Sequence, residues 1–538
     1  MRPAGTSLRA IQASRLRVAA RGQRRRRFAL TVVAALALTM LVASLADSNP
    51  DADDGTGGAS GAPATATARG LSISLGPTVG RPIPASFLGF SIEYPSAANY
   101  FGTPTAPNTV FQQLVKNLDP GQRPVLRFGG DSTDWSWWPV PGVKKPPGVT
   151  ISLGPRWTSI VRAGLAALNA SAILGIQFED DSRKVAGYEA GQLLSGLGRG
   201  AVAGFELGNE PEVYGALGWY HTAAGVQVPG RPRSYDVGTY LPDFRSIASA
   251  LPSGVPTAGP STGAPLYQAA VPRFIKAEPR VKFITLHRYP LRRCNTPASS
   301  PKSPTIAHLL ARSSSDGLAS SLAATAAVAH ADGARLRIDE LNSISCGGDL
   351  GVSNTFATTL WSLDTLFAMA RSGVDGVNVH TFTGSWYEPF AFTDKGGAWQ
   401  AQVMPLYYGL LAFADAAPPG ARLLKVGQPP ISTLRIWATR ATDGSERIVL
   451  INESPTTART LSLPAGRATA ATLTSLTAPS LSATSGVQIG GEAFAPETTT
   501  GLLGGLPAAP SVTAANGRFA VPVPAASAVI VTIPSSGL

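Results

Sequence analysis

The feature that most constrains the fold is a regular alternation of short apolar runs with longer amphipathic segments, from about residue 85 to residue 380. Helix-like segments include 157–168, 240–251 and 356–370. Eight runs read as strands: 86–94, 124–130, 172–178, 201–207, 255–260, 281–287, 334–340 and 374–380. Near-continuous apolar strands that alternate with helices are typical of a parallel sheet covered by helices.

Eight such units predict the α/β class and a (β/α)8 TIM barrel over residues 85–418. A doubly wound open sheet is the alternative, but no glycine-rich phosphate loop follows the first run. Residues 419–538 are rich in Thr, Ser, Ala, Pro and Gly and contain alternating runs, which predicts a C-terminal antiparallel β-sandwich domain. The short segment 71–84 is expected to add an N-terminal strand to that sandwich.

The net charge of +12 belongs to the N-terminus and not to the body of the chain. Residues 1–46 contain nine arginines and no acidic residue, which leaves 36 basic against 33 acidic side chains elsewhere. The balance argues against nucleic-acid binding by the body. The arginines precede an uncharged run from Phe28 to Ala46, which predicts a signal peptide or an uncleaved N-terminal membrane anchor. Cleavage is the favoured interpretation, and we expect an extracellular or cell-surface protein with a flexible linker over residues 47–70.

The chain has only two cysteines, Cys294 and Cys346. In an exported protein an even pair predicts one disulfide, and two unpaired thiols are the alternative. Two cysteines without a nearby histidine cluster do not indicate a zinc site, and we expect no metal.

Polar side chains follow most of the predicted barrel strands, at the end where functional groups gather in such barrels. They include Glu93, Asp131, Asn209, Glu210, Tyr289, Glu340 and His380. So many hydrogen-bonding groups at one mouth would be costly to desolvate without a ligand. The set therefore predicts a polar, hydroxyl-rich substrate.

Two glutamates at the ends of the fourth and seventh strands carry the most specific prediction. Glu210 lies in Gly-Asn-Glu-Pro after the fourth strand, and Glu340 ends the seventh. Glycoside hydrolysis needs one protonated carboxyl as acid and one ionised carboxyl as nucleophile or base. Their environments must push the two pKa values apart. We therefore predict a glycoside hydrolase with Glu210 as general acid/base and Glu340 as nucleophile.

Motifs spread over the whole barrel region resemble glycoside hydrolase family 79, which holds the heparanases and β-glucuronidases. They are FLGFSIE (87–93), LRFGGDSTD (126–134), ELGNEP (206–211), LHRYP (286–290) and ELNSISCGGDLGVSNTF (340–356). The last is the most telling, because this family places a Gly-rich loop just after its nucleophile. The family belongs to a retaining clan whose catalytic glutamates lie on strands 4 and 7. In the C-terminal domain the resemblance extends only to architecture and composition.

The resemblance implies further roles around the sugar. Asn209 would hydrogen-bond the 2-hydroxyl, and Tyr289 would donate to Glu340 and hold it ionised. Glu93 and Asp131 would accept from hydroxyls on the non-reducing side, with Asp134 as the competitor of Asp131. His380 would contact the sugar or its immediate surroundings.

The loop after Glu340 is the family's signature for a uronic acid. Ser345, Gly347 and Gly348 would turn backbone N–H groups toward the sugar carboxylate. The chain departs from the heparanase-like members by having Ser345-Cys346 where they have an aromatic residue and a further glycine. A bridge between Cys346 in this loop and Cys294 after the sixth strand would hold the loop beside the site.

These observations predict a retaining, exo-acting β-glucuronidase that releases glucuronic acid, or its 4-O-methyl form, from glycans or glycosides. A retaining β-glycosidase for a neutral sugar and a non-catalytic glycan-binding protein are the alternatives. No cofactor is expected, and the expected partner is a carbohydrate substrate, with no nucleic acid and with membrane contact only through the possible anchor.

Overall fold

The computed structural model describes residues 71–535. Their centre is a closed barrel of eight parallel strands, which confirms the predicted fold class. In chain order the barrel strands are β3 (Leu88–Ile92), β6 (Val125–Phe128), β9 (Ser171–Ile176), β10 (Val202–Leu207), β13 (Thr257–Thr262), β14 (Val281–Arg288), β16 (Arg335–Leu341) and β18 (Gly376–Thr381). The barrel closes where β18 pairs with β3. All the strands are parallel, so their carboxyl ends open at one mouth.

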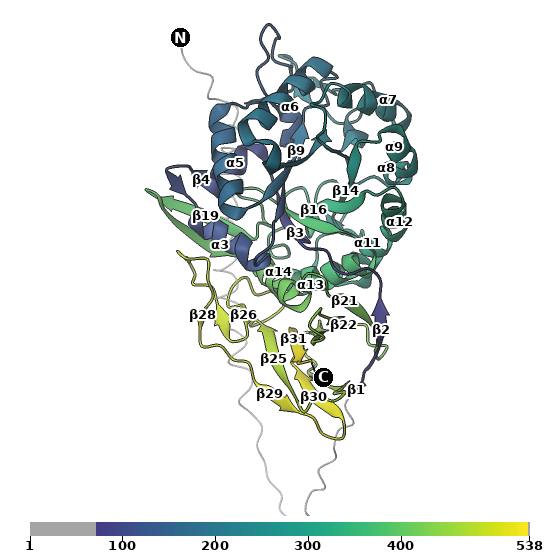
Figure 1. Cartoon of the computed structure of the whole chain (residues 1–538), viewed down its shortest axis with the longest axis vertical. Helices are drawn as coiled ribbons and strands as arrows, with labels where there is room; N and C mark the ends of the chain where they lie inside the picture. Colours follow the sequence, from purple (N-terminus) through teal and green to yellow (C-terminus); the bar gives the residue numbers. More distant parts are fainter. Residues whose placement is uncertain (1–70, 536–538) are drawn as a thin grey trace, which may run out of the picture. The chain divides into compact units, whose positions relative to one another are not determined.

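Helices surround these strands (Figure 1). The longer ones are α3 (Thr109–Leu118), α5 (Pro155–Leu168), α6 (Arg183–Leu197), α7 (Val237–Ala248), α9 (Val271–Ala277), α12 (Ala323–Ala331), α13 (Phe356–Arg371) and α14 (Pro405–Ala416). Several begin at a side chain that caps their free N–H groups: Asn108 caps α3, Ser182 caps α6 and Asp236 caps α7. The shorter helices are α2 (Ala97–Phe101), α4 (Ser132–Trp135), α8 (Pro265–Ala269), α10 (Ile306–Leu309) and α11 (Asp316–Ser320).

Short strands decorate the loops at the barrel ends. They form the pairs β4 (Gly102–Thr103) with β5 (Ala106–Pro107), β7 (Ser136–Trp137) with β8 (Ile151–Ser152), β11 (Tyr220–His221) with β12 (Gln227–Val228), β15 (Leu291–Arg292) with β17 (Ile344–Ser345), and β19 (Phe390–Lys395) with β20 (Ala398–Val403). The pair β15–β17 is parallel and prolongs the neighbouring barrel strands β14 and β16 beyond the mouth.

The C-terminal region forms two packed sheets. The larger contains β21 (Arg422–Gly427), β22 (Leu434–Arg440), β23 (Glu446–Asn452), β31 (Ser527–Ile533), β25 (Ala470–Thr477), β26 (Gln488–Ile489), β27 (Glu492–Ala493), β28 (Gly504–Gly505) and β29 (Ser511–Thr513). The smaller contains β24 (Arg459–Pro464) and β30 (Arg518–Val523). A separate apolar cluster fills the space between them, with Ile436, Leu450, Leu461 and Val521 among its members. Alternating inward and outward residues explain the Thr- and Ser-rich pattern of this region.

Two N-terminal strands join these sheets. β1 (Leu71–Ser72) pairs with β24, and β2 (Ser74–Val79) pairs with β21 at the edge of the larger sheet. The chain therefore passes through the β domain before it enters the barrel.

The barrel and the β domain share one hydrophobic core. The barrel's apolar cluster includes Leu476, Ile489, Phe494 and Ile530 of the β domain. A polar contact reinforces the junction, because the Trp437 indole N–H in β22 donates to the Asp364 carboxylate in α13 over 2.7 Å.

The predicted leader, anchor and linker lie outside the described residues. Within residues 71–535, no helix is both long and apolar enough to cross a membrane.

Candidate active site

Glu210 and Glu340 face each other across the mouth of the barrel. Glu210 follows β10 in a left-handed conformation with φ 50°, and its backbone N–H donates to the Ser261 carbonyl oxygen over 2.8 Å. Glu340 lies near the end of β16. One carboxylate oxygen of each glutamate and one ring nitrogen of His287 all lie within 4.8 Å of one another. Carboxyl groups about 5–5.5 Å apart suit a retaining mechanism, whereas inverting enzymes need a wider gap for a water molecule.

The surroundings of Glu340 keep it ionised. Its carboxylate accepts from Arg127 over 3.0 Å and from the Tyr289 hydroxyl over 3.1 Å. Burial would raise the pKa of Glu340, but the charges of His287, His380 and Arg127 and the Tyr289 hydrogen bond outweigh it and lower the pKa to about 2. An ionised carboxylate at this position is what a nucleophile requires.

His287 connects the two glutamates. Its Nδ1 lies 3.0 Å from Glu210 Oε1 and 3.3 Å from Glu340 Oε2. On the other side of the ring, Nε2 lies 3.1 Å from the Ser261 hydroxyl. Burial alone would lower the pKa of His287, but the carboxylates of Glu340 and Asp339 raise it well above the usual value. A protonated His287 therefore offers one N–H between Glu210 and Glu340.

Arg127 lies beneath Glu340 and contacts three carboxyl groups. This arginine of β6 is fully buried, and its Nε donates to Glu206 over 2.7 Å and lies 3.2 Å from Asp339. Burial raises the pKa of Glu206 to about 8 although Arg127 opposes the shift. The pKa of Asp339 is lowered, because Arg127, His287 and the Glu206 hydrogen bond outweigh its burial. Arg127 is thus a buried cation that contacts the carboxyl groups of Glu206, Asp339 and Glu340.

Three predicted sugar-binding residues lie beside this centre. The Asn209 side-chain oxygen accepts from Arg127 over 2.9 Å, and its amide nitrogen lies 3.5 Å from Asp131. His380 in β18 places Nδ1 3.3 Å from Glu340. Burial would lower the pKa of His380, but Glu340 and Glu93 raise it. Together with Tyr289, these side chains border the space between the glutamates.

Glu93 and Asp131 form the acidic edge of the mouth. Glu93 accepts from the Ser132 N–H over 2.9 Å and lies 3.6 Å from His380. Asp131 is an exposed residue. Desolvation among the walls of the mouth, followed by the charges of Glu93, Glu210 and Glu340, raises the pKa of Asp131 to about 8. Gly130 sits between the two with φ 90°, and a Cβ there would lie 2.3 Å from Glu93 Oε1.

Asp134, the alternative to Asp131 as a sugar contact, is instead bonded to other parts of the protein. It is buried, and its two oxygens accept from the backbone N–H groups of Phe178, Glu179 and Asn209 and from the Tyr214 hydroxyl. With its acceptor sites occupied by the protein, it holds the loops after β9 and β10 in place. Asp131 is therefore the better candidate for a sugar contact.

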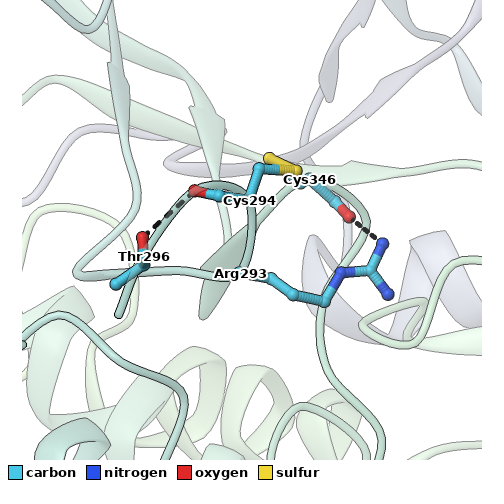
Figure 2. Close-up of a disulfide and its surroundings, with 4 residues drawn as sticks. All are labelled: Arg293, Cys294, Thr296 and Cys346. Carbon is cyan, nitrogen blue, oxygen red and sulfur yellow. Dashed lines mark hydrogen bonds between the residues drawn. A yellow bond between two sulfur atoms is a disulfide. The ribbon is translucent and has the colours of Figure 1, made fainter. Parts of the chain in front are cut away.

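The loop of Ser345, Gly347 and Gly348 lies beside the site. Cys346, Gly347 and Gly348 have φ values of 66°, 82° and 80°, so three successive residues are left-handed. Phe382 packs within 3.5 Å of the position of a Cβ on Gly347, and Phe382 and Tyr387 both pack near the His380 ring. Cys294 and Cys346 form the predicted disulfide (Figure 2).

Three residues of the site carry no role in the sequence prediction: Arg127, His287 and Tyr387. Tyr387 is buried, and its ring centre lies 6.3 Å from that of Tyr289. Arg127 lies in the motif LRFGGDSTD, and His287 lies in the motif LHRYP. For Arg127, the sequence indicates a special role only through the presence of a charged side chain within an apolar strand. Tyr387 follows β18 by six residues, so its position depends on the loop path.

Glu210, His287 and Glu340 are spaced so that they could also hold a metal ion. The donor set does not favour it, because the Arg127 guanidinium already lies 3.0 Å from Glu340 and would repel a cation. The absence of a metal or cofactor from the chemistry stays a prediction.

The C-terminal region matches a known family of domains. Residues 435–530 match the family model described as "Glycosyl hydrolase family 79 C-terminal beta domain". The chain is 24% identical over 421 residues to a "Beta-glucuronidase" of Neurospora crassa. That match covers 69% of this chain and 72% of the relative. These matches confirm the resemblance to glycoside hydrolase family 79 and extend it to the C-terminal domain.

Solved structures share the architecture. A 4-O-α-L-rhamnosyl-β-D-glucuronidase from Fusarium oxysporum matches with a TM-score of 0.61 and 17% identity, over 86% of this chain and 99% of that structure. A GH51 arabinofuranosidase from Xanthomonas axonopodis pv. citri matches with a TM-score of 0.58 and 15% identity, over 86% of this chain and 99% of that structure. At these identities the likeness establishes the fold alone.

Proposed function

We propose that this chain is a retaining, exo-acting β-glucuronidase of the kind found in glycoside hydrolase family 79. The observation that carries the proposal is the pairing of Glu210 with an ionised Glu340 within 4.8 Å, beside a Gly-rich loop, in a chain that resembles β-glucuronidases over most of its length. Its substrate is a carbohydrate, a glycan or glycoside that ends in glucuronic acid or its 4-O-methyl form.

The reaction proceeds by double displacement. Glu340 attacks the anomeric carbon while Glu210 protonates the leaving oxygen, and a covalent glycosyl-enzyme forms. Glu210 then removes a proton from water, which attacks the anomeric carbon and releases the sugar with its original configuration. Asn209 binds the 2-hydroxyl, where hydrogen bonds strengthen in the transition state.

His287 supports both half-reactions. Its protonated ring contacts both carboxyls, 3.0 Å from Glu210 and 3.3 Å from Glu340. As Glu340 loses its charge in the covalent intermediate, His287 can strengthen its contact with Glu210, which becomes ionised at the same step. The charge between the glutamates is therefore balanced before and after attack.

The sugar carboxylate binds at the loop that contains Gly347 and Gly348. The Gly348 N–H donates to the Ile344 carbonyl, so the Gly347 N–H is the donor of this left-handed turn that is left for an anion, and glycine allows the close approach. Glu93 and Asp131 accept from hydroxyls at the opposite edge of the ring.

We also propose that the protein acts outside the cytoplasm. The support is the arginine-rich segment before an uncharged run in residues 1–46, together with a disulfide between the chain's two cysteines. Detection of the protein in the culture medium or on the cell surface, and N-terminal sequencing of it, would test export and cleavage.

The test of the activity is a panel of 4-nitrophenyl glycosides: the β-D-glucuronide, glucoside, galactoside and xyloside. We expect cleavage of the glucuronide, and a loss of at least about 10³-fold in kcat in Glu340→Gln. Cleavage of a neutral glycoside alone would overturn the uronate assignment. Sugar binding that is insensitive to Glu340→Gln, without turnover of any glycoside, would indicate a binding protein.

A further inference from the structure

The loops after β14 and β16 are joined beyond the mouth of the barrel. β15 pairs with β17 in parallel, with Leu291 opposite Ile344 and Arg292 opposite Ser345. The Cys294–Cys346 disulfide follows at once. The loop after the nucleophile is therefore held to its neighbour by a ladder and by a covalent bond.

Arg293 adds a third connection. Its guanidinium donates to the Cys346 carbonyl oxygen over 2.6 Å, and Figure 2 shows this bond beside the disulfide. The same guanidinium lies 3.8 Å from the position of a Cβ on Gly347. The carbonyl and the N–H of a trans peptide point to opposite sides. A cation at the Cys346 carbonyl therefore turns the Gly347 N–H away from Arg293 and polarises it as a donor.

The rest of the turn leaves that N–H free for a ligand. The Gly348 N–H donates to the Ile344 carbonyl over 3.1 Å, and the Gly347 carbonyl accepts from Trp386 over 2.8 Å. Within residues 71–535, the Gly347 N–H has no hydrogen-bond acceptor.

The conformation of Cys346 needs external support. Its φ of 66° is uncommon for a residue with a Cβ, and such conformations persist where the surroundings fix them. The disulfide and Arg293 act on this residue from its side chain and from its carbonyl. Burial raises the pKa of Asp349, the only acidic side chain of the turn, and the charge of Arg293 opposes that shift.

We propose that Arg293 and the Cys294–Cys346 disulfide form a clamp that sets the affinity of this enzyme for the sugar carboxylate. The clamp fixes the Cys346–Gly347 peptide with its N–H toward the carboxylate, and Arg293 acts as a positioning residue that does not touch the sugar. The inference rests on the proposed β-glucuronidase activity and adds the residues that determine its specificity.

The first test compares Arg293→Met with Arg292→Met in the full chain. Both arginines are exposed, but only Arg293 donates to the loop, so Arg292→Met is the matched control. For 4-nitrophenyl β-D-glucuronide we expect Arg293→Met to raise KM about tenfold, because the Gly347 N–H is no longer held toward the sugar carboxylate. We expect kcat to stay within about twofold. Product inhibition by glucuronate should weaken by the same factor. Arg293→Lys should restore most of the affinity.

The second test uses the fact that the chain has no cysteine besides Cys294 and Cys346. Dithiothreitol can therefore break only this bridge. We expect it to raise KM for the glucuronide in the wild type, and to change nothing in the Cys294→Ser, Cys346→Ser double variant, whose KM is already raised.

The outcomes separate the two proposals. A wild type that does not cleave the glucuronide would refute the proposed function. A wild type that cleaves it with the same KM in Arg293→Met and after reduction would refute the clamp alone. A fall in kcat with KM unchanged would also refute the clamp, because it would place the effect at the reacting centre.

Discussion

The Tyr289 hydroxyl is expected to contribute to activity at acidic pH, in addition to the charges of His287, His380 and Arg127. Tyr289 donates to Glu340, and this bond helps to lower the pKa of Glu340 to about 2 against the effect of burial. Loss of a hydrogen bond to the charged form raises a pKa. Tyr289→Phe should therefore move the acid limb of kcat/KM to higher pH, as measured by a pH profile on the glucuronide.

The control for this prediction is Tyr188→Phe. Tyr188 lies on α6, where it packs against the apolar cluster of Trp137, Val140, Val149 and Val185, and it has no hydrogen bond to Glu210 or Glu340. Its profile should match that of the wild type. An acid limb in Tyr289→Phe that coincides with the wild-type limb would contradict the assigned role of Tyr289.

The residues of the site were predictable to the extent that they end strands. Glu210, Glu340, Tyr289 and His380 follow apolar runs, and a barrel brings such positions to one mouth. Arg127 lies inside a strand, where its inward direction depends on the closed barrel. The choice between Asp131 and Asp134 was open in the sequence, because it depends on which carboxylate the backbone N–H groups of other loops occupy.

At the scale of elements, the contact between α13 and β22 is expected to contribute to stability through one polar bond. The Trp437 indole N–H donates to the buried Asp364 over 2.7 Å, and its ring stacks on Phe367 with centroids 5.6 Å apart. Trp437→Phe keeps an aromatic ring but removes the donor. It should lower the free energy of unfolding by about 1–3 kcal/mol in urea titrations.

The matched variant is Trp399→Phe in β20. That indole donates to the neutral Ala106 carbonyl over 3.1 Å at a partly exposed position, so its loss should cost about 1 kcal/mol or less. Equal losses in the two variants would show that the Asp364 contact has no special weight.

Element types were easier to predict than element ends. The fifth strand was expected at 255–260 and lies at Thr257–Thr262. On the side of β14 its pairing begins with the Thr257 N–H, which donates to the Arg280 carbonyl, and on the side of β10 the Pro256 carbonyl accepts from the Phe205 N–H. The end of a strand depends on its neighbours, and a single run of residues does not contain that information.

At the scale of the whole molecule, the shared core predicts one folding unit over residues 71–535. Leu476, Ile489, Phe494 and Ile530 of the β domain lie in the barrel's apolar cluster. Removal of residues 419–538 would expose that surface to water. We expect a single calorimetric transition for the chain, and aggregation of a fragment that ends at residue 418. Two separate transitions, or a soluble fragment with the same Tm, would contradict this.

Trapping of the covalent intermediate would identify the nucleophile directly. A 2-deoxy-2-fluoro-β-D-glucuronyl fluoride should form a covalent glycosyl-enzyme that hydrolyses slowly. The fluorine at C2 destabilises both oxocarbenium-like transition states, whereas the anomeric fluoride is a good leaving group and lets the first step proceed. Mass spectrometry of the intact protein and of its peptides should find one 2-deoxy-2-fluoroglucuronyl adduct, on Glu340. An adduct on another residue, labelling only by the corresponding glucosyl fluoride, or release of the inverted sugar without an adduct would contradict a retaining β-glucuronidase with Glu340 as its nucleophile.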